Sequence, residues 1–187
     1  MKGMSGQSAI SLAADAPLDP RGERLAALFD AHEDRLYRLA RRLAARPDDA
    51  RDLVQETYLR AAKSLSSIPR GLANEEAWLV RVLVNIRRDQ WRKIAVRRRS
   101  AALLRASGSS GGSSLESALI VKRAVWGALD ALTPRRRAVV VMHELEGMSL
   151  PAIAFLLGVT TMTARWHLSL ARRELKRVLA PYMRGTS

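Results

Sequence analysis

Side chains that could contact DNA gather between Thr161 and Arg173, directly after a predicted turn. The turn is Gly158-Val159-Thr160, where glycine tolerates a positive φ and threonine can cap the following helix. A short helix, a turn and a longer helix form a helix-turn-helix, whose second helix enters the major groove of DNA. We expect that helix to contact the duplex through Thr161, Met162, Thr163, Arg165, Trp166, His167, Arg172 and Arg173.

The spacing of these side chains separates base contacts from phosphate contacts. Arg165 lies near the helix start and can form two hydrogen bonds with a guanine edge. Arg172 and Arg173 lie two turns further on, where phosphates are the expected partners. The alternative is a helical hairpin with a solvated basic face, but the coincidence of turn, cap and charge favours DNA.

A second basic face is predicted in the middle of the chain. Its polar members recur at three- and four-residue steps, opposite an apolar stripe that begins at Leu79. We expect it to bind DNA through Arg81, Asn85, Arg88, Trp91, Arg92 and Lys93. An indole among arginines suits stacking on an unpaired base, although the same indole could simply seal the edge of the core. Binding to anionic lipid is the weaker alternative, because this helix has a domain to pack against.

Acidic residues cluster in a third segment, residues 23–63. This segment is nearly neutral, although the chain carries a net charge of +14. Acids near a helix N-terminus complement the helix dipole, but Glu56 lies too far into the helix for that explanation. We therefore predict a docking face for a basic protein partner, formed by Asp49, Asp52, Leu53, Gln55, Glu56 and Leu59.

Residues suited to catalysis or metal binding form no pattern. The three histidines, His32, His143 and His167, fall on different predicted helices, and the chain has no cysteine. We expect no cofactor, no metal and no enzymatic activity. The excess of 32 Lys and Arg over 18 Asp and Glu predicts a polyanionic partner. No apolar run approaches the ~20 residues of a membrane helix, so the predicted location is cytoplasmic, at the nucleoid, with no membrane partner.

The elements that must position these residues are all predicted to be helices. Apolar residues repeat at helical steps in three segments. The first helix is predicted from Glu23 to Leu43, the second begins after Asp48 or Asp49 as its N-cap, and the third begins at about Asn74. Beyond a Ser/Gly-rich stretch at residues 107–114 the same periodicity restarts, with further helices beginning near Leu115, Pro134, Ser149 and Thr160.

The sequence thus predicts an all-α chain with two small helical domains joined by a flexible Gly/Ser linker. The predicted divisions are a disordered extension, a first domain, the linker, a second domain ending in the helix-turn-helix, and a tail, at residues 1–22, 23–99, 100–114, 115–182 and 183–187.

Several motifs, in order, resemble the sigma-70 family and its extracytoplasmic-function (ECF) group. Residues 49–60 resemble the family's helix that binds core polymerase, and Trp78 to Asn85, with Asp89, resembles its minus-10 helix. Residues 132–139 and 144–150, then 157–160 and 171–175, resemble the domain that recognises the minus-35 element.

The resemblance implies a transcription initiation factor. The first domain would bind the clamp helices of the largest polymerase subunit, hold an extruded minus-10 base in its loop from Ser64 to Asn74, and hold the melted strand on its basic face. The second domain would bind the minus-35 duplex and the polymerase flap, and an anti-sigma factor is an implied partner. Met162 and His167 depart from the family, which usually has glycine and a basic residue there, so the promoter sequence is expected to be atypical.

Two other function classes remain to be separated from this one. An operator-binding helix-turn-helix regulator would bind duplex DNA tightly without polymerase. A protein that only sequesters an anti-sigma factor would leave the recognition helix without a function.

Overall fold

The structure is a computed structural model that describes residues 19–44, 46–102 and 117–183. Within these ranges every regular element is helical, which confirms the predicted all-α class. In order they are α1 (Pro20–Leu43), α2 (Pro47–Lys63), η1 (Leu65–Ser67), α3 (Leu72–Ala102), α4 (Ser117–Ala131), α5 (Pro134–Val140), η2 (Val141–Leu145), α6 (Leu150–Leu157) and α7 (Thr161–Met183). Most of the predicted extension, linker and tail lies outside the described residues.

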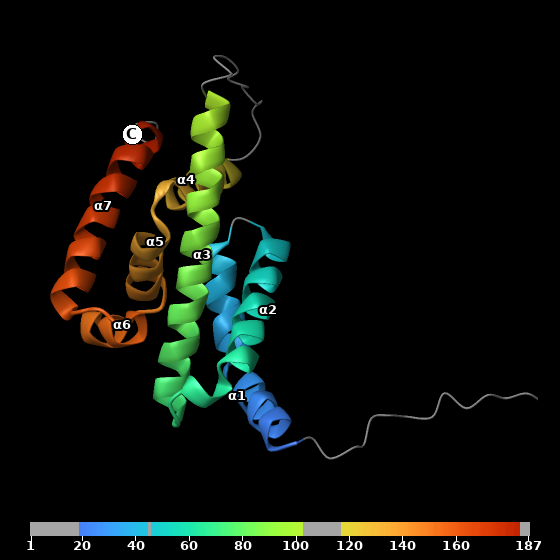
Figure 1. Cartoon of the computed structure of the whole chain (residues 1–187). Coiled ribbons are helices and arrows are strands. Elements are labelled where there is room, and N and C mark those ends of the chain that lie inside the picture. Colours follow the sequence, from blue (N-terminus) through green and yellow to red (C-terminus); the bar gives the residue numbers. More distant parts are fainter. Residues whose placement is uncertain (1–18, 45, 103–116, 184–187) are drawn as a thin grey trace, which may run out of the picture.

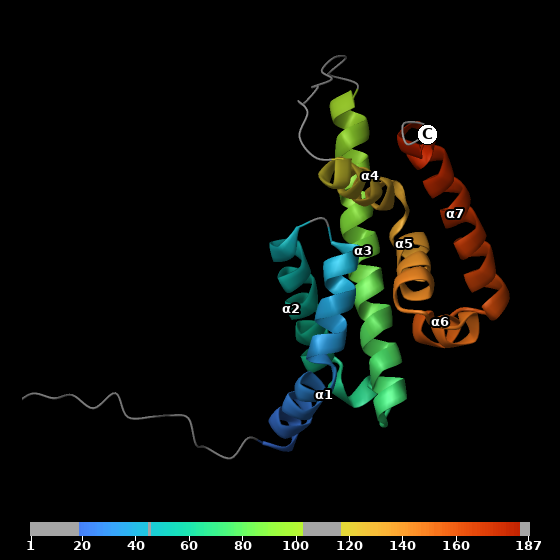
Figure 2. The same cartoon turned by 180° about the vertical axis from the view of Figure 1, so that it is seen from behind.

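Helices α1 to α3 form a first unit, in which α1 and α2 lie side by side against α3 (Figures 1 and 2). Helix α1 begins at Pro20, three residues before the predicted start, because Asp19 caps it by accepting a 2.6 Å hydrogen bond from the backbone N–H of Gly22. The core of this unit is a set of fully buried leucines, Leu36, Leu39, Leu43, Leu53, Leu79 and Leu83.

The start of α2 differs from the prediction. Its N-cap is Arg46, which makes no capping hydrogen bond through its side chain, and Pro47 is the first helical residue. Proline begins a helix readily because its φ is already helical and it lacks the N–H that would go unpaired. Asp48 and Asp49 therefore lie in the first turn, where they complement the helix dipole, rather than at the cap.

Helices α4 to α7 form a second unit, whose α6 and α7 make the predicted helix-turn-helix. Gly158 adopts a φ of +64° between them, as expected for a turn that needs glycine. Thr160 accepts a 3.1 Å hydrogen bond from the backbone N–H of Thr163, and Ser149 caps α6 through Ala152. The turn and both caps are therefore confirmed.

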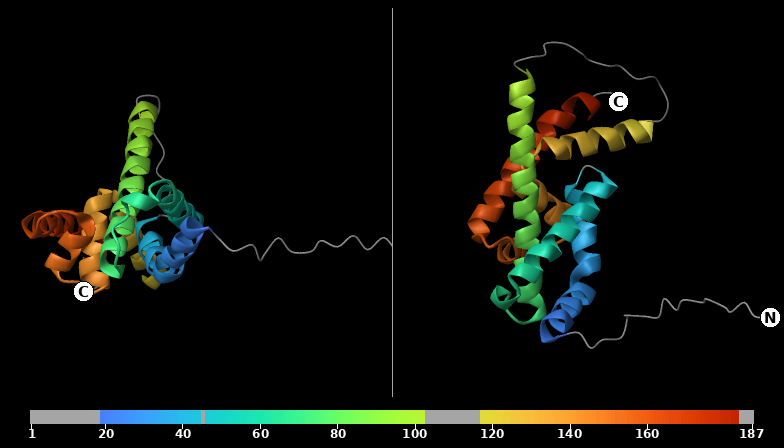
Figure 3. Two further views of the ribbon diagram at one scale, coloured as in Figure 1. Left: turned by 60° about the horizontal axis from the view of Figure 1, so that its bottom comes forward. Right: turned by 45° about the vertical axis from the view of Figure 1, so that its right-hand side comes forward.

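The two units are packed against each other, since α5 and α6 both contact α3 (Figures 1 and 3). A single cluster of buried apolar side chains runs through both, from Leu28 in α1 to Ala171 in α7. The sequence predicts two domains joined by a flexible linker. It does not predict the interface between them, which is the main new feature of the structure.

Arg137 in α5 is the centre of this interface, with a side chain that is almost completely buried. Its Nε donates a 2.8 Å hydrogen bond to the carbonyl of Arg42, and its Nη2 donates one of 3.3 Å to the carbonyl of Ala44. Its other nitrogen pairs with Asp130, and its guanidinium lies 5.7 Å from the ring centroid of Trp126. Burial, opposed by Asp130, lowers the pKa of Arg137.

Glu146, just after η2, joins the second unit to α1 through two arginines. Its carboxylate accepts a 2.7 Å hydrogen bond from Arg42 and pairs with Arg35, and its side chain is only 8% exposed. Arg35 also donates to Glu76 at 3.0 Å. Burial alone would lower the pKa of Arg35, but the two carboxylates outweigh it and raise that pKa.

Gly158 also forms part of the interface, since a Cβ at this position would lie 2.9 Å from Cδ of Arg81 in α3. The Arg81 side chain cannot move without cost, because its Nε donates a 2.9 Å hydrogen bond to the carbonyl of Ala77. The turn of the helix-turn-helix is thus held directly against the first unit.

We expect Gly158→Ala to lower the free energy of unfolding by about 2 kcal/mol and Gly147→Ala by about 1 kcal/mol. Both glycines have a φ near +65°, but a Cβ at Gly147 would meet nothing within 4 Å. Denaturant unfolding of both variants, repeated with Arg81→Ala present, measures the difference. Equal costs for the two glycines in the otherwise natural chain would contradict the close approach to Arg81.

Candidate polymerase and nucleic-acid interfaces

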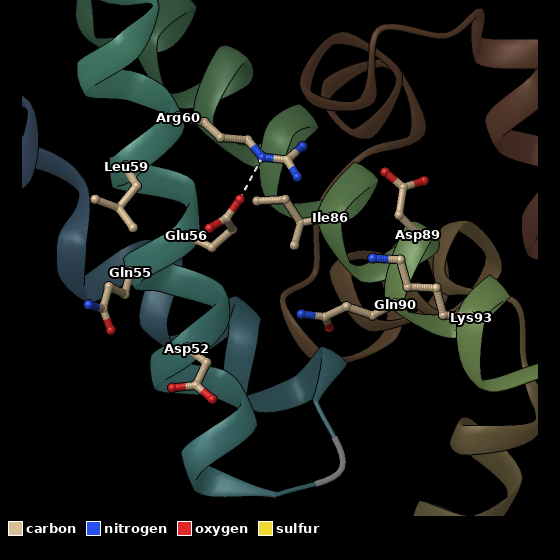
Figure 4. A pocket seen from close by; sticks show the side chains of 9 residues that line it. All are labelled: Asp52, Gln55, Glu56, Leu59, Arg60, Ile86, Asp89, Gln90 and Lys93. Atoms are coloured by element: carbon tan, nitrogen blue, oxygen red, sulfur yellow. Dashed lines mark hydrogen bonds and ion pairs between the residues drawn. The ribbon is translucent and has the colours of Figure 1, made fainter. Parts of the chain in front are cut away.

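Four of the six predicted docking residues lie on one wall of a groove of about 450 Å³ (Figure 4), namely Asp52, Gln55, Glu56 and Leu59. The other wall is α3, so the groove joins residues about thirty positions apart in the sequence. Its lining consists of Asp52, Gln55, Glu56, Leu59, Arg60, Ile86, Asp89, Gln90 and Lys93. The acidic face of α2 and the end of the basic face of α3 therefore meet at one site.

Two of the predicted docking residues play other roles than expected. Leu53 is 0% exposed and packs in the core, because it lies on the face of α2 that is turned toward α1 and α3, so it cannot contact a partner. Glu56 is half-buried and accepts a 3.0 Å hydrogen bond from Arg60, one turn further on. Asp49, Asp52, Gln55 and Leu59 are exposed, as predicted.

An apolar groove of about 710 Å³ lies on the other side of the same α2 ridge, toward α1. Gln55 and Leu59 line both grooves, so they form the crest between them. The apolar groove is bounded by Phe29, whose ring is 5.0 Å from that of Tyr58, and burial with the charge of Glu33 raises the pKa of Tyr58. A partner that covers this crest would meet acidic groups on one side and an aromatic surface on the other.

The second unit covers one end of the basic face of α3 and leaves the other end exposed. Arg81 lies against the Gly158 turn and is half-buried, whereas Arg92 and Lys93 are exposed. Asn85, Arg88 and Trp91 have intermediate exposure. The structure therefore brings these residues onto one helix as predicted, with its far end the most accessible.

The loop predicted to hold an extruded base is shorter than expected, because α3 already begins at Leu72. Leu65 and Ile68 anchor it in the core, and Arg24 donates a 2.6 Å hydrogen bond to the carbonyl of Ile68. A hollow of about 360 Å³ lies beside it, lined by Pro20, Arg21, Arg24, Leu65 and Ser66.

Helix α7 buries Ala164, Leu168 and Ala171 and leaves the opposite face exposed. Of the predicted contact residues, Met162, Arg165, Trp166, Arg172 and Arg173 are exposed, and Thr161, Thr163 and His167 have intermediate exposure. Two of these polar groups are already engaged. The hydroxyl of Thr163 lies 2.8 Å from that of Thr160, and Arg172 pairs with Glu144 at 2.7 Å.

The surroundings of His167 disfavour its charged form. Burial, followed by the charges of Arg135 and Arg136 in α5, lowers its pKa. Its ring centroid lies 5.0 Å from that of Trp166, so the two aromatic rings are in contact.

Sequence reasoning missed Ile86 and Gln90 as members of the α2–α3 groove. Ile86 belongs to the predicted apolar stripe of α3 and is only 3% exposed, and Gln90 lies four residues after it and three before Lys93. That spacing is the signal that could have found them. Among the described residues, no helix has the length and apolar character needed to cross a membrane, and no group of His, Asp or Glu is placed to hold a metal ion.

Comparison with known proteins gives the two units separate matches. The family profile for sigma-70 region 2 matches residues 28–98, and that for sigma-70 region 4 matches residues 122–175. These ranges fall in the first and second units respectively.

Curated relatives match across both units. The chain is similar to the ECF RNA polymerase sigma factor SigE of Mycolicibacterium smegmatis, at 33% identity over 86% of this chain and 63% of that protein. It is also similar to the ECF RNA polymerase sigma factor SigL of Mycobacterium tuberculosis, at 32% identity over 82% of this chain and 87% of the relative.

Solved structures share the fold. One is the sigma factor RpoE of Bartonella quintana in complex with the anti-sigma factor NepR, with a TM-score of 0.55 and 25% identity over 84% of this chain and 95% of the other. Another is CnrH in complex with the cytosolic domain of CnrY, also with a TM-score of 0.55, over 84% of this chain and 88% of the other. With matches to both characteristic regions in the family's order, the chain belongs to the ECF group of the sigma-70 family.

Proposed function

We propose that this chain binds bacterial core RNA polymerase and directs it to promoters, by binding the minus-35 element as duplex and the minus-10 element as melted strand. The observation that carries the proposal is the pair of sigma-70 regions, one in each unit, each presenting exposed groups suited to its partner. Polymerase would supply the chemistry of RNA synthesis, and the chain would supply recognition and no catalysis. It would act in the cytoplasm, at the chromosome.

The proposed polymerase contact is the crest of α2. Asp52 supplies an exposed negative charge, and Gln55 and Leu59 lie between a polar and an apolar groove. Basic and apolar side chains of the clamp helices would be complementary to this surface. Complementary charge of this kind fixes the register of a complex and speeds its formation.

The proposed minus-10 site is the far end of the basic face of α3, together with the hollow beside η1. Arg92 and Lys93 are exposed and would bind phosphates, while Trp91 would stack on an unpaired base. Extruding a base costs a few kcal/mol of stacking, which such contacts must offset. Arg21 and Arg24 line the hollow near the start of α3, at the other end of that helix from Trp91, and would bind a different part of the melted strand.

The proposed minus-35 site is the exposed face of α7. Arg165 near its start would contact a base edge, and Arg173 would bind phosphate from two turns away. An anti-sigma factor is a further proposed partner, because the structural relative from Bartonella quintana is in complex with one.

Transcription in vitro with purified core polymerase and a library of genomic fragments tests the proposal. Addition of the chain should produce RNA with defined 5′ ends from a small set of fragments, whereas polymerase alone should start at random. An operator-binding regulator would instead bind its fragments tightly in the absence of polymerase and add no new start sites. That result would overturn the proposed function.

A further inference from the structure

Two large apolar side chains are exposed on α7 at the place where DNA contacts are expected. Met162 is 68% exposed and Trp166 is 55% exposed. They are four residues apart and therefore share one face, about 6 Å apart along the helix axis. An exposed apolar pair on one face of a helix can contribute to a binding surface.

The surroundings of this apolar pair favour a polyanion over an apolar protein surface. Arg165 and Arg173 are exposed on the same helix. The carboxylates of Glu174 and Glu144 are each paired with another arginine: Glu174 with Arg136 at 3.0 Å, and Glu144 with Arg172. They therefore do not offset the charges of Arg165 and Arg173. The surface therefore combines two apolar groups with an excess of positive charge.

A DNA major groove matches that combination. Its phosphates are negative, and the apolar group that it presents to a recognition helix is the C5 methyl of thymine. Two polar neighbours of the apolar pair already have partners inside the protein. The Thr163 hydroxyl lies against that of Thr160, and the His167 ring packs against the indole, so Met162 and Trp166 are the side chains expected to contact the thymine methyl.

We propose that Met162 and Trp166 determine promoter specificity by packing on thymine methyl groups of the minus-35 element. The inference rests on the proposed function. The ~6 Å between the two residues along the helix corresponds to about two base-pair steps of ~3.4 Å when the helix follows the groove. The element should therefore contain two thymines about two positions apart, on either strand.

Replacement of single thymines by deoxyuridine tests the proposal, because uracil lacks only the methyl group. The probe is a fragment from which the polymerase holoenzyme initiates, with each minus-35 thymine replaced in turn. Loss of one contacted methyl should weaken holoenzyme binding about fourfold. Met162→Ala should remove the effect of uracil at one position, and Trp166→Ala should remove it at the other.

Leu145→Ala is the matched control, since Leu145 is 59% exposed in the second unit but lies in η2. It should keep the full response to uracil, and all three variants should unfold at the temperature of the natural chain. Equal responses to uracil in Met162→Ala, Trp166→Ala and the natural chain would overturn the inference, as would a minus-35 element without thymine.

Two other outcomes also decide the matter. If both variants bind promoter normally but lose binding to an anti-sigma factor, the apolar pair serves a protein partner and the inference is wrong. If no fragment supports initiation that depends on the chain, the proposed function fails and the inference fails with it. Normal initiation without any response to uracil overturns the inference alone.

Discussion

Asp52→Lys should weaken the binding of this chain to core polymerase about 100-fold and leave its unfolding temperature unchanged. Asp52 is exposed on the α2 wall of the groove in Figure 4, beside the Gln55–Leu59 crest. Lysine there would meet the basic clamp helices of the proposed complex, and like charges brought together at an interface cost several kcal/mol. Binding to labelled core polymerase at physiological salt measures the effect.

Asp48→Lys provides the control for net charge. Asp48 is also an exposed carboxylate of α2, but it lies in the first turn and does not line the groove. The same reversal of charge there should reduce polymerase binding by less than about threefold. Similar losses for Asp48→Lys and Asp52→Lys would mean that overall charge, rather than this surface, governs the association.

Arg137→Ala should lower the free energy of unfolding by about 3 kcal/mol, which corresponds to a fall of about 9 °C in unfolding temperature. The change removes the donors that satisfy the carbonyls of Arg42 and Ala44 at the end of α1. It also removes the ion pair with Asp130 and leaves a cavity between the units. Calorimetry and denaturant unfolding measure the loss.

Arg136→Ala separates the effect of burial from the effect of losing one arginine. Arg136 is the neighbouring residue of α5, and its pair with Glu174 is partly exposed. Such pairs contribute about 1 kcal/mol or less. If Arg137→Ala were no more harmful than Arg136→Ala, the interface between the units would add little to stability.

The helices and the helix-turn-helix could be predicted from the sequence because their signals are local. Gly158, Thr160 and Ser149 act within four residues of their partners, so turn and cap chemistry identifies them. The position of the α2 cap was missed because two opposing local signals compete there. Proline favours the first position of a helix, so α2 begins at Pro47. The two aspartates after it then lie in the first turn, where they complement the helix dipole instead of capping the helix.

The interface between the units could not be predicted, because its partners are distant in sequence. Arg137 bonds to a carbonyl 95 residues away, and Arg35 pairs with a carboxylate 111 residues away. In the sequence these arginines are indistinguishable from those of the basic faces. The error at Leu53 has a different origin, because its helical spacing already groups it with Val54, Tyr58 and Ala61, and all four are buried.

The contact between Gly158 and Arg81 has a consequence for how the chain spans a promoter. Elements centred near positions 10 and 35 before the start site are about 25 base pairs apart, or about 85 Å along B-DNA. Under the proposed function, two units that touch through Arg81 cannot occupy both elements, so they must part when polymerase takes up the chain. The interface that stabilises the free protein would then oppose initiation. The free energy needed to separate the two units would reduce the net free energy of binding to polymerase and promoter. Dyes on the two units that stay close together in an initiating complex would contradict this.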